Sequence, residues 1–155
     1  MLSSTQLEEL CRIIRDAGLM DGCEWTVEVA PSEISSEKLD VLAEGGVTRI
    51  SLGVQTFSPE MMKSLGRHHK VEKVFSAYSM IREKAVFRVN LDLLFGAPGQ
   101  TLDMWELDLR TAAELEPDHL STYCLTFEED TAMYVRLSEG KVKLDVDREA
   151  EFYEK

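Results

Sequence analysis

Three polar side chains lie at the ends of apolar runs or inside one, where they could build a ligand site. Glu28 and Gln55 each end a short run, and Asp92 lies inside residues 89–94. Functional groups of parallel α/β folds gather at the carboxyl ends of the strands, so the three predict one polar-lined mouth. Structural alternatives remain: a solvated strand end for Glu28, a turn for Gln55 and a hydrogen-bonded carboxylate for Asp92. For Asp92 the functional interpretation is favoured, because a carboxylate in an apolar run needs a partner.

A basic cluster occupies residues 66–70 of this otherwise acidic chain. Arg67 could bind a carboxylate or phosphate through two parallel hydrogen bonds. The alternative is a solvated loop between helices, which is the better interpretation for Lys70. His68 and His69 are adjacent and would point in different directions on a helix, so this spacing does not favour a shared metal ion.

Two further features carry little chemistry by themselves. Residues 96–101, Gly-Ala-Pro-Gly-Gln-Thr, allow a tight loop but match neither a Walker loop nor a GxGxxG motif. Cys11, Cys23 and Cys124 are far apart and show no metal-ligand spacing. They are expected to be reduced, mostly buried thiols of a cytoplasmic protein.

The elements that would position these residues alternate between helix and strand. Strands are expected near residues 25–29, 49–54, 87–95 and 119–126, and each is joined to the next by a segment that contains a helix. Helices are expected from Ser3 to Gly18 and near 35–45, 58–65 and 71–84, with another capped by Thr101. A short helix, a turn at Gly140 and an acidic tail from Asp145 follow. This order predicts parallel strands in a layered α/β fold, either a doubly wound sheet or part of a barrel.

Composition restricts the classes of partner. The net charge of the 155 residues is -12, without a basic patch for nucleic acid or an anionic membrane surface. No apolar run reaches the roughly 20 residues of a membrane span, and the first residues do not resemble a signal peptide. We therefore expect a single cytoplasmic domain over 1–155, which binds no nucleic acid and has no transmembrane segment.

Several long motifs, taken in order, resemble the radical SAM family of oxygen-independent coproporphyrinogen III oxidases and haem chaperones. The sequences of residues 65–69 and 96–101 resemble the haem-chaperone branch more than the oxidases. The motifs that carry the resemblance are residues 27–31, 46–57, 65–69, 90–101, 119–123 and 140–144.

The resemblance implies a fold and a cofactor. The chain would form strands three to six of a six-stranded partial TIM-type barrel, and about 130–155 would begin the following segment. S-adenosylmethionine (SAM) would be the small-molecule ligand. Arg67 would hold its methionyl carboxylate, and carboxylate and amide groups would bind its ribose hydroxyls and amino group. The matching family positions are Glu28, Gln55, Arg67, Asp92 and Thr126.

The chain also departs from the family. The family's CxxxCxxC run, which holds a [4Fe-4S] cluster, belongs to a strand upstream of this sequence, and the three cysteines here do not match it. Glu129 and Asp130 stand where the family often has Pro-Gly. The intact parent would carry the cluster and act on porphyrin or haem, whereas this chain alone is expected to be inactive.

Two other functions remain open from the residues. One is a non-enzymatic module that binds haem or a partner on the same face, with His68, His69 or a cysteine as the iron ligand. The other is an ordinary barrel enzyme that uses Glu28 and Asp92 as acid and base. The first strand would also expose an unpaired edge, which predicts dimerisation.

Overall fold

A parallel four-stranded sheet organises the molecule. The computed structural model describes residues 2–19, 22–67, 70–142 and 146–155. The strand order is β1-β2-β3-β4, so each strand pairs with its neighbour in the chain. A doubly wound sheet would reverse its order at a switch point, and this sheet does not, which is the arrangement of a barrel segment. The strands are β1 (Thr26–Val29), β2 (Arg49–Gln55), β3 (Arg88–Phe95) and β4 (His119–Cys124).

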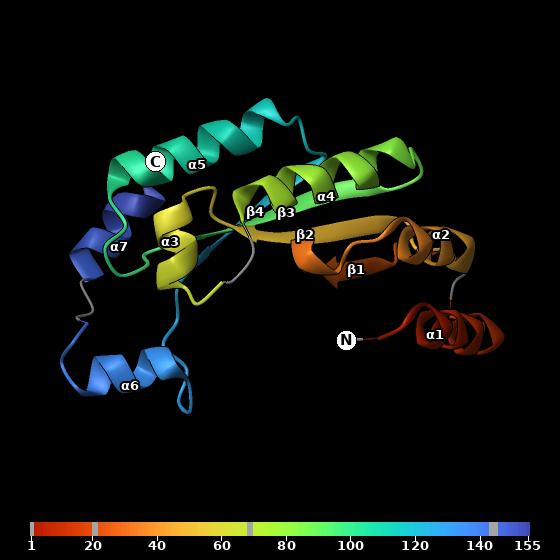
Figure 1. The fold of residues 1–155 in the computed structure, drawn as a ribbon, viewed down its shortest axis with the longest axis horizontal. Coiled ribbons are helices and arrows are strands. Elements are labelled where there is room, and N and C mark those ends of the chain that lie inside the picture. Colours follow the sequence, from red (N-terminus) through yellow and green to blue (C-terminus); the bar gives the residue numbers. More distant parts are fainter. Residues whose placement is uncertain (1, 20–21, 68–69, 143–145) are drawn as a thin grey trace.

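Helices join the strands and confirm the expected alternation. In Figure 1, α4 and α5 lie together on one face of the sheet, while α1 lies beside α2 at the β1 edge. The side chains of Ser35, Ser58, Thr101 and Thr131 cap helices, and Ser3 and Gln6 form the expected capping box. The helices are α1 (Ser4–Asp16), a 3-10 turn η1 (Pro31–Glu33), α2 (Ser36–Gly45), α3 (Pro59–Ser64), α4 (Val71–Glu83), α5 (Leu102–Glu114), α6 (Ala132–Ser138) and α7 (Val146–Tyr153).

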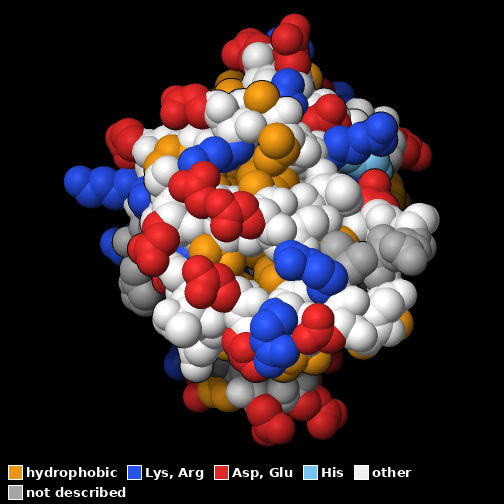
Figure 2. Space-filling model, turned by 90° about the vertical axis from the view of Figure 1, so that its right-hand side faces the viewer, with side chains coloured by type: hydrophobic (Ala, Val, Ile, Leu, Met, Phe, Trp, Pro, Cys, Tyr) orange, Lys and Arg blue, Asp and Glu red, His pale blue; other side chains and the backbone are white. Residues whose placement is uncertain are grey.

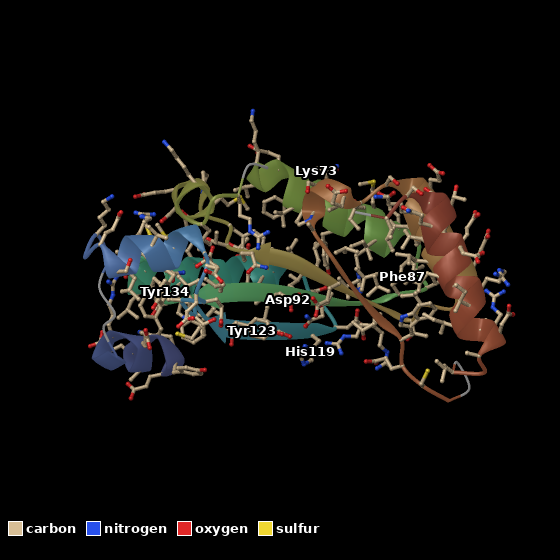
Figure 3. The ribbon with its side chains drawn as sticks, turned by 90° about the horizontal axis from the view of Figure 1, so that it is seen from below. Lys73, Phe87, Asp92, His119, Tyr123 and Tyr134 are labelled. Atoms are coloured by element: carbon tan, nitrogen blue, oxygen red, sulfur yellow. The ribbon has the colours of Figure 1, made fainter. Side chains whose placement is uncertain are left out.

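The two faces of the sheet differ in chemistry because successive side chains of a strand point in opposite directions. On the helix-covered face, alternate residues of β2 and β3 form the fully buried centre of the core: Ile50, Leu52, Val54, Val89, Leu91 and Leu93. The opposite face is polar. Figure 3 looks at this polar face, on which Asp92, His119 and Tyr123 lie on neighbouring strands.

The last strand is shorter than expected. Residues 119–126 were the expected range, but the strand ends at Cys124, which pairs with Phe95. The next residue of β3's chain, Gly96, has a φ of 77° and turns away, so the parallel ladder loses its partner there. Thr126 therefore follows the strand instead of closing it.

The C-terminal residues do not form the expected acidic tail. Helix α7 buries Phe152, which is 2% exposed and whose ring lies 6.2 Å from that of Phe95. The Trp105 indole N–H donates to the carbonyl of Phe152 at 3.1 Å. The buried Phe152 ring holds this acidic segment on the core. The charge of the segment alone did not indicate this contact. Asp145, where the tail was expected to begin, lies outside the described residues.

The surface carries charges of both signs. Figure 2 views the end of the molecule at which the strands begin, and its acidic and basic side chains are interspersed with small hydrophobic areas. Within the described residues, no helix has the length and apolar character needed to cross a membrane.

Candidate functional site

A cavity of about 280 Å³ lies where β1 and β2 end. Glu28 comes from β1, Gln55 from the end of β2, Asp92 from β3, and Arg67 from the segment after α3. The structure thus brings together four side chains that the sequence predicted to share one site. The rest of the lining comprises Val29, Ala30, Ser51 and Gly53.

Gln55 reaches the cavity through an irregular strand end. The pairing of β2 with β3 shifts by one residue between Gly53 and Gln55, as in a β-bulge. Gln55 has a φ of 69°, a left-handed conformation that is uncommon for a residue other than glycine. A Cβ atom at Gly53 would lie 3.1 Å from the side-chain Nε2 of Gln55, so glycine at this position leaves room for the Gln55 side chain. Backbone strain of this kind concentrates at functional sites.

The loop after Gln55 is anchored by a buried carboxylate on α5. Asp108 is 1% exposed and accepts hydrogen bonds from the Thr56 hydroxyl and the Phe57 backbone N–H, both at 2.7 Å. Thr56 in turn accepts from the backbone N–H of Ser58, the N-cap of α3, at 3.0 Å. Burial raises the pKa of Asp108, and these two hydrogen bonds oppose the rise. Asp108 therefore fixes the loop that joins Gln55 to α3 and Arg67.

Asp92 is held by hydrogen bonds within the polar face. Its two carboxylate oxygens accept from the Ser51 hydroxyl and the Asn90 amide, each at 2.7 Å. This is the partner that a carboxylate in an apolar run requires, so the structural interpretation of Asp92 has support. The same carboxylate also lines the cavity, where its remaining lone pairs can accept from a ligand.

The side chains of Glu28 and Arg67 are exposed at the rim of the cavity. Neither one hydrogen-bonds or pairs with another side chain in the described part of the structure. The Arg67 backbone N–H donates to the carbonyl of Met62 at 2.8 Å, directly after Gly66, whose φ is 69°. This αL turn at the end of α3 directs the chain toward the cavity, and the two opposite charges at the rim can bind a ligand.

Thr126 and the histidine pair stand apart from this arrangement. Thr126 is exposed in the segment after β4 and is not among the residues that line the cavity. His68 and His69 lie outside the described residues, so the structure neither supports nor opposes an iron ligand there.

The cysteines were expected to be mostly buried, and only Cys11 is; Cys124 is half-buried and Cys23 exposed. A Cβ atom at Gly45 of α2 would lie 2.4 Å from the Cys11 sulfur, so this thiol fills the close contact between α1 and α2. Burial raises the pKa of Cys11 and Cys124, which keeps these thiols protonated. No group of three or more His, Cys, Asp or Glu in the described residues could hold a metal ion, so they do not fit a cluster.

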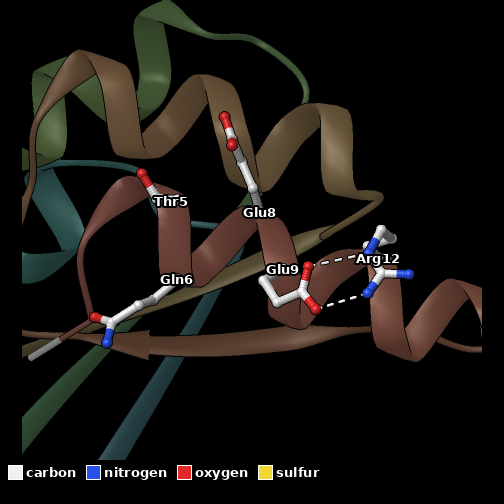
Figure 4. A pocket seen from close by; sticks show the side chains of 5 residues that line it. All are labelled: Thr5, Gln6, Glu8, Glu9 and Arg12. Atoms are coloured by element: carbon white, nitrogen blue, oxygen red, sulfur yellow. Dashed lines mark hydrogen bonds and ion pairs between the residues drawn. The ribbon is translucent and has the colours of Figure 1, made fainter.

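Two other hollows occur near α1. One lies on the surface of that helix and is lined by five residues, of which Glu9 and Arg12 already bind each other at 2.6 Å (Figure 4). The other lies beneath α1 along the β1 edge and is lined mainly by apolar side chains such as Leu7, Cys11 and Trp25. Among the described residues, neither hollow combines carboxylates with a cation that lacks a side-chain partner, as the strand-end cavity does.

Sequence reasoning missed several residues that build the site. Asn90 and Ser51 are buried and hold Asp92, and their alternation with apolar residues along two strands was a signal that could have identified them. Gly53 could have been recognised only from the bulge. Asp108 gave no periodic signal, because a single carboxylate on an amphipathic helix usually faces solvent.

Comparisons with known proteins place this geometry in a family. Residues 2–112 match the model of the radical SAM superfamily. The heme chaperone HemW of Bacillus subtilis is 39% identical over 99% of this chain and 41% of its own length. The oxygen-independent coproporphyrinogen III oxidase of Paracoccus denitrificans is 37% identical over 68% of this chain and 23% of its own length.

A solved structure agrees with these sequences. Coproporphyrinogen III oxidase (HemN) from Escherichia coli, described as a radical SAM enzyme, superposes with a TM-score of 0.79 at 27% identity. The match covers 99% of this chain and 36% of the oxidase. The chain thus matches between about a quarter and two fifths of the length of these relatives. Fold, motif order and family model agree, and the chain belongs to the radical SAM superfamily.

Proposed function

We propose that the strand-end cavity binds S-adenosylmethionine. The observation that carries the proposal is the convergence of Glu28, Gln55, Arg67 and Asp92 from four segments on one cavity. The guanidinium suits the methionyl carboxylate, and the two carboxylates suit the ammonium, the ribose hydroxyls and the positive sulfonium. One cation and two anions in the lining complement a ligand with two positive charges and one negative charge.

The intact protein would be a radical SAM protein of haem metabolism, closer to the haem chaperones than to the oxidases. Similarity to the heme chaperones of Bacillus subtilis and Lactococcus lactis over 99% of this chain supports that branch. Porphyrin or haem would be a partner of the intact, cytoplasmic protein. Its [4Fe-4S] cluster would supply the electron that cleaves S-adenosylmethionine.

We assign to the residues of this chain the binding of S-adenosylmethionine but not its cleavage. Cys11, Cys23 and Cys124 lie on α1, before β1 and at the end of β4, and they do not form a cluster site. Arg67 would orient the methionyl end, and Asp92 and Gln55 would orient the nucleoside. The chain would therefore bind the ligand and leave it unchanged.

Isothermal calorimetry with S-adenosylmethionine tests the proposal. The full chain is expected to bind, and Arg67→Ala is expected to weaken binding about tenfold, since a hydrogen bond to a charged group contributes about 1.5–3 kcal/mol. Arg136→Ala on α6 is the matched control, because it removes an exposed guanidinium far along the chain from the cavity. A folded wild-type chain without measurable affinity would refute the proposal.

The edge of β1 is proposed to support self-association. In the described sheet β1 pairs only with β2, so its other side lacks a strand partner. The Trp25 carbonyl accepts from the Arg49 backbone N–H of β2 at 3.2 Å. Backbone N–H and C=O groups point to alternate sides along a strand, so those of Thr26 and Glu28 point to the open edge. An edge of this kind can pair with a second copy of the chain.

A further inference from the structure

A chain of hydrogen bonds crosses three strands on the polar face, below the cavity. Asn90, which is 1% exposed, is its centre. Its amide nitrogen donates to the Ser51 hydroxyl and to Asp92, both at 2.7 Å. Its amide oxygen accepts from the Ser121 hydroxyl at 3.1 Å and also contacts Nδ1 of His119. Both donors and both acceptor positions of the amide are therefore used.

The carboxylate sets the direction of this chain. An ionised Asp92 can only accept, so Asn90 must present its NH₂ group to Asp92 and its oxygen to β4. Since that oxygen can only accept, Nδ1 of His119 must carry a proton. The Arg49 guanidinium lies 3.5 Å from the same Nδ1, which is longer than an ordinary hydrogen bond. A guanidinium can only donate, and a protonated Nδ1 cannot accept, so this contact is not a hydrogen bond. Arg49 is also bound to Glu24 at 3.1 Å.

The other ring nitrogen is consequently an acceptor. Neutral histidine carries one proton on its ring, so with Nδ1 protonated the lone pair of Nε2 is available. Within the described residues, nothing hydrogen-bonds to Nε2 of His119, and the side chain is exposed on the polar face (Figure 3). One buried amide thus determines the state of two groups on different strands.

We propose that Asn90 is the positioning residue of this face. Together with Ser51 it holds the carboxylate of Asp92 toward the cavity, and it holds His119 as the Nδ1–H tautomer with Nε2 as an acceptor. The effect on Asp92 rests on the proposed binding of S-adenosylmethionine. The effect on His119 does not, so the two can be tested separately.

The tautomer of His119 is read from its ring nitrogens by ¹⁵N NMR, at a pH where the imidazole is neutral. Wild type is expected to show a protonated Nδ1 and a bare Nε2, and Asn90→Ala is expected to lose this preference. A wild-type ring protonated on Nε2, or an unchanged tautomer in Asn90→Ala, would overturn the assignment. Asn90→Leu, which keeps the size of the side chain but has no acceptor, replaces Asn90→Ala if the latter does not fold, and the same loss of the tautomer preference is expected.

Calorimetry with S-adenosylmethionine tests the effect on Asp92 by a double-mutant cycle. Asn90→Ala is expected to weaken binding about three- to tenfold in the wild-type background and by less than about twofold in Asp92→Ala, because the loss acts through Asp92. Ser121→Ala, which removes a hydroxyl that hydrogen-bonds to Asn90 and not to the Asp92 carboxylate, is the control and should keep the affinity within about twofold.

The outcomes separate the two proposals. Equal losses from Asn90→Ala in both backgrounds would show that Asn90 does not act through Asp92. No binding by wild type, together with the expected tautomer, would refute the proposed function while leaving the control of His119 by Asn90 intact. A merely structural role of Asn90 would lower stability without coupling to Asp92.

Discussion

Asp92 and Asp108 are two carboxylates with nearly the same local hydrogen bonding and different surroundings. Each accepts two hydrogen bonds of 2.7 Å. Asp108 is enclosed by the loop after β2 and α5, whereas half-buried Asp92 faces the cavity. The bonds of Asp108 go to the backbone and a hydroxyl of a loop that must stay in place, and those of Asp92 leave lone pairs free for a ligand. Solvent access, more than hydrogen bonding, therefore distinguishes a carboxylate that anchors a loop from one that can bind a ligand.

The largest effect is expected from Asp108→Ala. This change leaves the Phe57 N–H and the Thr56 hydroxyl buried without an acceptor and should lower the free energy of unfolding by about 3 kcal/mol. Urea denaturation followed by circular dichroism measures it. Glu114→Ala, an exposed carboxylate on the same helix, is the control and should change stability by less than about 0.5 kcal/mol. Equal effects of the two changes would remove the anchor role.

Asp92→Ala should have the opposite profile. We expect affinity for S-adenosylmethionine to fall about tenfold to hundredfold, since a charged acceptor is lost from the cavity. Stability should fall by only about 1 kcal/mol, because the hydroxyl and amide left behind can bind water in the cavity. Calorimetry and urea denaturation of the same sample measure both. A large stability loss with unchanged affinity would make Asp92 a second anchor.

The pH dependence of stability tests the burial of the Asp108 carboxyl. Burial raises the pKa of Asp108, so the folded state holds that proton more tightly than the unfolded state. Its contribution to stability is present below the ordinary carboxyl pKa and is lost as pH rises through the raised value. Wild type should therefore gain stability relative to Asp108→Asn as the pH falls toward that range. A stability difference that stays constant with pH would contradict the raised pKa.

The smallest effect on the fold should come from Thr26→Pro at the open edge of β1. Proline removes an N–H that points away from β2, so stability should change by less than about 1 kcal/mol. Light scattering should show self-associating wild type and a more monomeric variant. A wild type that remains a monomer over a wide concentration range would refute the edge proposal.

Much of the architecture could be predicted from the sequence because local signals agree with the fold. Ser58 and Thr101 cap helices where expected, and parallel connectivity brings Glu28, Gln55 and Asp92 to one sheet edge. Arg67 joined them through the motif resemblance and its side-chain chemistry.

The remaining features depend on tertiary contacts that no local pattern encodes. The bulge before Gln55 depends on the register between two strands, and the docking of Phe152 depends on a core assembled from distant segments. Asp108 is buried only because the loop after β2 folds over it. Asn90 gains its role from neighbours on two other strands, one of them 31 residues further along the chain.

Backbone NMR shifts recorded during a titration with S-adenosylmethionine test most directly where this ligand binds. We predict binding at the strand-end cavity: the backbone amide signals of Val29, Gly53, Gln55 and Asp92 should shift in a saturable way, while those of the α1 hollow, Thr5 to Arg12, should not shift. Saturable shifts confined to α1, or no shifts at all in a well-folded sample, would contradict it.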